Sequence, residues 1–137
     1  MAEVILQGTT GDGSVEELVT NWIEEMRKGR EDTWGPRMEQ VIHNVALTLT
    51  LVNRYRGDRP GIPLRPTSIA RMLTASRGWR EQFLRTGLPP DGSDPLVDEV
   101  LKWWREYDSL EPSRREEIIR PVLNLVPAGA SRDAGNG

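Results

Sequence analysis

Residues 36–56, PRMEQVIHNVALTLTLVNRYR, carry the pattern that decides the fold. Apolar side chains recur three and four residues apart, which is the period of one helix face. These are Met38, Val41, Ile42, Val45, Leu49 and Val52. The stretch begins at a proline, a favoured residue in a first helical turn, and it stops by Gly57. We therefore predict one long helix here, the spine of the domain.

Similar signals on both sides of this stretch predict further helices. Ser14 and Glu17 have the spacing of a capping box, and Gly29 fits a C-terminal stop. The later helices are expected at residues 67–75, between a separating Gly78 and a stop at Gly87, from Asp94-Pro95 to about residue 110, and after Pro112, with a kink or break at Pro121. The sequence predicts an all-α fold, a compact bundle of five or six helices.

Twelve apolar residues on these helix faces form the predicted core. They are Leu18, Trp22, Ile42, Val45, Leu49, Leu73, Phe83, Val100, Leu101, Trp104, Ile119 and Val122. Trp79 also falls on an apolar stripe and is expected inside. Trp34 is expected to pack onto the long helix as a staple, and Trp103 to be partly exposed.

Length and composition predict one helical domain at residues 14–126. Residues 1–13 read as a flexible arm or short strand, and residues 127–137, PAGASRDAGNG, as a disordered tail. No apolar run approaches the roughly 18 residues of a membrane span. The N-terminus lacks the basic and apolar regions of a signal peptide, so we expect a cytoplasmic location.

The residue types that usually carry catalysis are scarce. The chain has no cysteine and one histidine, His43, which sits in the long predicted helix as a packing or surface residue. The only G-x-G, at residues 11–13, lacks the context of a phosphate-binding loop. The acidic pairs, such as Glu24-Glu25, suit solvated helix faces. We expect no enzyme activity, no metal and no cofactor, and hence a binding function.

The net charge of −3 conceals a strong asymmetry. Residues 1–35 carry eight acids against three bases, and residues 91–117 carry nine against four. Between them, residues 54–85 hold eight arginines against two acids, a local balance of +6. These are Arg54, Arg56, Arg59, Arg65, Arg71, Arg77, Arg80 and Arg85. Guanidinium groups bind phosphate well, which makes this cluster the candidate DNA site. The alternative is that the arginines pair with the acidic helices at either end.

Motifs from Trp34 to Asn124 resemble a known family. The pattern opens with Trp34-Gly35-Pro36-Arg37-Met38-Glu39, followed by Asn44 and Ala46-Leu47. Its middle part consists of Ile69, Met72-Leu73-Thr74, Trp79-Arg80, Phe83-Leu84, Asp94-Pro95-Leu96-Val97, Trp103 or Trp104, Tyr107 and Leu110. It closes with residues 115–124, REEIIRPVLN. This order is similar to the all-α domain inserted in the motor ATPases of type IV secretion coupling proteins and their HerA/FtsK-like relatives. Leu125 stands where that family usually has lysine.

The resemblance implies the all-α domain alone, without the nucleotide-binding motifs of the motor. It implies a non-catalytic substrate-recognition role in conjugative DNA transfer. Its partners would be DNA or a relaxase–DNA complex, together with the motor ATPase core. Two alternatives stay open: a protein-only adaptor that binds a partner helix or secretion signal, and a small helical subunit of a defence complex that binds the nucleic-acid backbone.

Overall fold

A computed structural model describes residues 15–56, 62, 64–90, 92 and 94–125 of the chain. These residues form six α-helices and one short 3₁₀ turn, and no strand occurs among them. The elements are α1 (Val15–Arg27), η1 (Glu31–Thr33), α2 (Pro36–Arg56), α3 (Pro66–Thr74), α4 (Arg77–Gly87), α5 (Pro95–Ser109) and α6 (Pro112–Leu123). The prediction of an all-α bundle is confirmed. The predicted arm at residues 1–13, the Ser14 cap and the tail at residues 127–137 lie outside the described residues.

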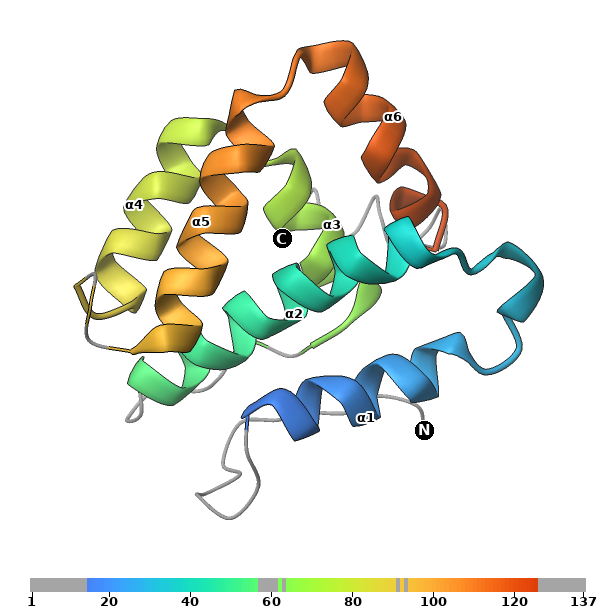
Figure 1. The fold of residues 1–137 in the computed structure, drawn as a ribbon, viewed down its shortest axis with the longest axis horizontal. Helices are drawn as coiled ribbons and strands as arrows, with labels where there is room; N and C mark the ends of the chain where they lie inside the picture. Colours follow the sequence, from blue (N-terminus) through green and yellow to red (C-terminus); the bar gives the residue numbers. More distant parts are fainter. Residues whose placement is uncertain (1–14, 57–61, 63, 91, 93, 126–137) are drawn as a thin grey trace.

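The central element is α2, which packs against all five other α-helices. It runs diagonally through the bundle, with α1 along one side, α4 and α5 at one end and α6 at the other (Figure 1). The core stripe predicted for it is buried throughout. Three polar residues of α2 are buried with it, and each bonds to a carbonyl one turn earlier: the Asn44 amide donates to Gln40, and the Thr48 and Thr50 hydroxyls donate to Asn44 and Ala46. These bonds allow polar side chains to sit inside a helix that is enclosed on all sides.

The helix ends follow local chemistry. Gly29 adopts a positive φ of 79° just after α1, as expected for a glycine that stops a helix. The Asp94 carboxylate accepts from the amide of Leu96 and caps α5, which then begins at a proline. The predicted break at Pro121 is wrong, because α6 continues through Pro121 to Leu123. Pro121 lacks the amide hydrogen that would bond to the Glu117 carbonyl, so one backbone hydrogen bond of the helix is missing there.

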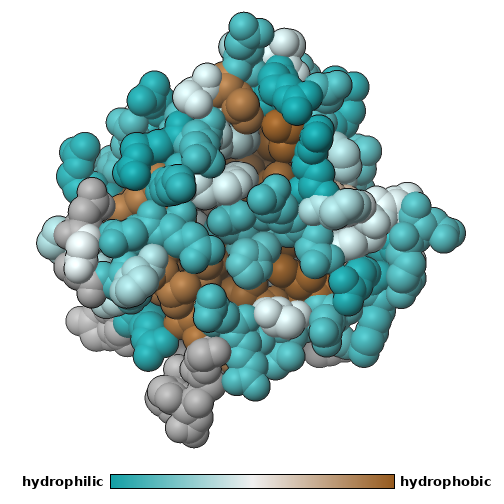
Figure 2. All heavy atoms as spheres, in the orientation of Figure 1, coloured by the Kyte–Doolittle hydropathy of each residue, from teal (hydrophilic) through white to brown (hydrophobic). Residues whose placement is uncertain are grey.

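Nine of the twelve predicted core residues are buried, and Leu18, Phe83 and Leu101 are partly buried. Trp22 and Trp104 are inside as expected, and Trp103 is partly exposed. The prediction for Trp79 is wrong: the side chain is 50% exposed and stacks on Phe83, with ring centroids 5.1 Å apart. The side of α4 that faces the core is occupied instead by Arg80, Leu84 and Gly87. On the face of the molecule shown in Figure 2, hydrophobic residues are visible only in seams between hydrophilic ones.

None of the described helices is long and apolar enough to cross a membrane.

Candidate functional site

The eight arginines of the predicted DNA site do not lie together. Arg54 is exposed near the end of α2, Arg65 is exposed directly before α3, and Arg71 is exposed on α3. Arg77, Arg80 and Arg85 lie on α4 and line a groove between α4 and α5. Arg56 is the last residue of α2, and Arg59 lies outside the described residues. The cluster therefore divides into an α2–α3 group and an α4 group.

Arg80 must be removed from the candidate DNA contacts, because only 3% of it is exposed. Its guanidinium forms an ion pair and a hydrogen bond with the carboxylate of Asp108 on α5. Its Nη1 also donates to two carbonyls at the end of α3, Ala75 at 3.0 Å and Met72 at 3.3 Å. A guanidinium held in this way cannot reach a phosphate. The alternative reading, pairing with an acidic helix, is the correct one for this residue.

Aromatic rings complete the enclosure of Arg80. The guanidinium lies 4.8 Å from the ring centroid of Trp104 and 5.4 Å from that of Tyr107, which are cation–π distances. Trp104 Nε1 donates to the Thr48 hydroxyl at 3.0 Å, and the Tyr107 hydroxyl donates to the Leu73 carbonyl at 2.8 Å. Burial raises the pKa of the Tyr107 phenol. The network connects α2, α3, α4 and α5 around one buried charge.

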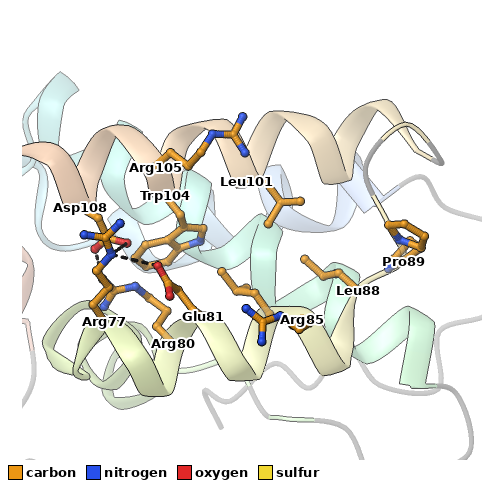
Figure 3. A pocket seen from close by; sticks show the side chains of 12 residues that line it. Arg77, Arg80, Glu81, Arg85, Leu88, Pro89, Leu101, Trp104, Arg105 and Asp108 are labelled. Carbon is orange, nitrogen blue, oxygen red and sulfur yellow. Dashed lines mark hydrogen bonds and ion pairs between the residues drawn. The ribbon is translucent and has the colours of Figure 1, made fainter.

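Two carboxylates of this region are already paired with arginines. Asp108, with a side chain 8% exposed, pairs with Arg80 and lies 4.0 Å from Arg77 Nε. Glu81 accepts from Arg77 Nε at 2.9 Å on the exposed side of α4. Figure 3 shows these four side chains gathered at one end of the groove. Sequence reasoning did not single out Asp108, although it lies four residues after Trp104, beside the apolar stripe of α5.

The α4–α5 groove continues from this charged cluster toward Pro89 and Pro90 and has a volume of about 570 Å³. Leu84, Leu88, Leu101 and Trp104 line it with apolar surface. Arg85 lies on its α4 side and Arg105 on its α5 side (Figure 3). Arg105 was not among the predicted site residues, because from the sequence it reads as an ordinary charge on an acidic helix.

One asparagine links the chain that precedes α3 to the end of α2. Asn53 Nδ2 donates to the Ile62 carbonyl at 2.9 Å, and its Oδ1 accepts from the Ile62 amide at 2.7 Å. This pair of bonds holds Ile62, three residues before Arg65, beside the last turn of α2. Arg71 follows about 9 Å further along α3, at 1.5 Å per residue.

A second hollow surrounds the Trp34-Gly35-Pro36-Arg37 motif and is lined also by His43, which is partly exposed. Here Glu39 Oε1 accepts from Trp34 Nε1 at 2.7 Å and from Arg27 Nη1 at 2.9 Å. Trp34 is thus fixed to the start of α2, where a staple was predicted. Within the described ranges, no three histidine, aspartate or glutamate side chains are placed to hold a metal ion.

Comparison of the chain with protein-family models, with curated proteins and with solved structures finds no match.

Proposed function

We propose that this chain is a non-catalytic substrate-recognition domain of a conjugative DNA-translocation motor, and that it contacts the DNA backbone through Arg54, Arg65 and Arg71. The observation that supports this most directly is that all three of these arginines are exposed. The family resemblance of residues 34–124 supplies the motor and the relaxase–DNA complex as the context.

Exposed acidic residues elsewhere on the surface limit where DNA could approach. The acidic pairs of α1, α5 and α6 are exposed, as at Glu24-Glu25, Asp98-Glu99 and Glu116-Glu117, and they would repel phosphate. In the part of the chain that the structure describes, Arg71 has no ion-pair partner. DNA would therefore approach the exposed arginines of α2 and α3, and it would bind weakly, because Asp94 at the start of α5 lies close enough to interact with Arg54. Arginine–phosphate contacts carry no base information, so sequence preference should be small.

Fluorescence anisotropy with a labelled 30-base-pair duplex in low salt tests the proposal. We expect each of Arg54→Ala, Arg65→Ala and Arg71→Ala to weaken binding several-fold. The matched control is Arg114→Ala, which removes an exposed α6 arginine whose pair with Glu117 spans 3.3 Å. This control should bind like the parent. If the parent does not bind, or if the three variants bind as the parent does, the DNA proposal fails and the adaptor alternative replaces it.

Association with a motor is tested separately. The full chain, carrying a photo-crosslinking residue in place of exposed Arg71, is expressed in cells that perform conjugation. We expect a crosslink to the transferred DNA, the relaxase or the motor ATPase in mass spectrometry. Crosslinks to unrelated proteins alone would contradict the conjugation context without affecting the DNA measurement.

A further inference from the structure

We propose that the α4–α5 groove is a docking site for an acidic amphipathic helix of a partner protein. The site goes beyond the DNA proposal, because its floor and the residue Arg105 take no part in DNA binding. Three features of the groove carry the inference: an apolar floor, unpaired positive charge on both sides, and a length of several helical turns.

The floor offers apolar surface at the bottom of an open groove. Leu88 follows the end of α4, and Leu101 and Trp104 come from α5 (Figure 3). Leu84, Leu88 and Trp104 are only 7%, 9% and 2% exposed, so Leu101, Pro89 and Pro90 offer most of the accessible apolar surface. At one end of the groove Arg80 on α4 reaches across to Asp108 on α5. The groove has a volume of about 570 Å³. Apolar side chains of a partner would be desolvated here.

The charges that flank the floor favour an acidic partner. The two carboxylates of the groove, Glu81 and Asp108, are already paired with Arg77 and Arg80. Arg85 and Arg105 are exposed, and neither has a hydrogen-bond or ion-pair partner among the residues that the structure describes. Four arginines against two carboxylates leave a balance of +2, on the two sides of an apolar strip. A ligand with an apolar face flanked by carboxylates would match both the apolar strip and the positive charges beside it.

The dimensions favour a helix. Lining residues on and just after α4 run from Arg77 to Leu88, which is about 16 Å or three turns at 1.5 Å per residue. An amphipathic helix in such a groove presents side chains at positions i, i+3, i+4 and i+7 to the floor. Carboxylates on both borders of that stripe would then face Arg85 and Arg105.

The experiment selects ligands without assuming their sequence. Random 16-residue peptides displayed on phage are enriched against the full chain, and the enriched peptides are synthesised and titrated. We expect a consensus of apolar residues at helical spacing bordered by Asp or Glu. We also expect Arg85→Glu and Arg105→Glu each to weaken binding about tenfold or more, as for the loss of a charge-assisted hydrogen bond.

Two controls separate this site from the DNA site. Arg71→Glu should leave peptide binding unchanged, and Arg105→Glu should leave DNA binding unchanged. Arg85 and Arg105 are both exposed, so their substitution should leave the fold intact. Circular dichroism of each variant checks this.

The proposal is overturned by any of several results: no enrichment, a consensus without acidic residues, or binding that tolerates both groove substitutions. It is also overturned, in favour of a second copy of this chain as the occupant, if light scattering shows a dimer that Arg105→Glu dissociates.

Discussion

Asp108→Ala is expected to destabilise the domain strongly, because it leaves the Arg80 guanidinium buried without its carboxylate. Removing one member of a buried ion pair costs about 3–5 kcal/mol. Arg80 keeps its bonds to the Met72 and Ala75 carbonyls and its contact with Trp104, so we expect the lower end, about 3 kcal/mol. For a chain of this size that loss lowers Tm by about 10 °C.

Urea unfolding, followed by circular dichroism and tryptophan fluorescence, measures this loss as a double-mutant cycle. Arg80→Met should cost about as much as Asp108→Ala, because each leaves one charge or acceptor unpaired. The double variant should cost far less than the sum of the two, since no unpaired charge remains. Glu81→Gln is the control: it breaks the exposed pair with Arg77 and should change stability by less than about 0.5 kcal/mol. Losses below about 1 kcal/mol, or strict additivity, would refute the reasoning.

Further predictions concern packing and pH. A Cβ on Gly87 would lie 3.0 Å from a methyl of buried Val52. Gly87→Val should therefore lower the free energy of unfolding by about 1–3 kcal/mol in urea titrations, and adding Val52→Ala should recover part of that loss. An unchanged unfolding free energy in Gly87→Val would contradict the close approach of α4 to α2. Thr48→Val should cost about 1–3 kcal/mol by leaving the Trp104 indole N–H unpaired, and a neutral result in thermal melts would argue against that bond. Burial raises the pKa of Tyr107 in the folded state, so its contribution to stability is complete below the unfolded pKa near 10 and is lost as pH rises through the folded value. The free energy of unfolding, measured between pH 8 and 12, should show this pH-dependent loss in the parent but not in Tyr107→Phe.

The sequence was most informative about α2. Its apolar residues keep one helical period over 21 residues, and neighbours on every side bury the predicted stripe. Helix order and most boundaries follow from local signals such as Gly29 and Asp94-Pro95. These features depend on interactions between residues that are close together in the chain, so they can be predicted from the sequence alone.

The short helix α4 shows where sequence reasoning failed. Two stripes compete there, about 100° apart around the helix: Trp79 with Phe83, and Arg80 with Leu84. Hydrophobicity favours the first stripe, but the second is buried. What decides is the position of Asp108, 28 residues later, together with the last carbonyls of α3. Such long-range partners leave no mark in local periodicity.

The candidate sites depend on tertiary structure in the same way. Composition correctly marked residues 54–85 as rich in arginine, but it could not divide them into an exposed α2–α3 group and a buried α4 residue. It could not reveal Arg105 either, because that residue becomes notable only when α5 lies beside α4.

The salt dependence of duplex DNA binding tests the central claim most directly. Three arginine–phosphate contacts should give a slope of log K against log salt concentration of about −3, at roughly 0.9 per contact. Arg71→Ala should flatten the slope by about one, whereas Arg80→Ala should not alter it in protein that remains folded. A slope near zero, or one that Arg71→Ala leaves unchanged, would contradict DNA recognition by the α2–α3 arginines.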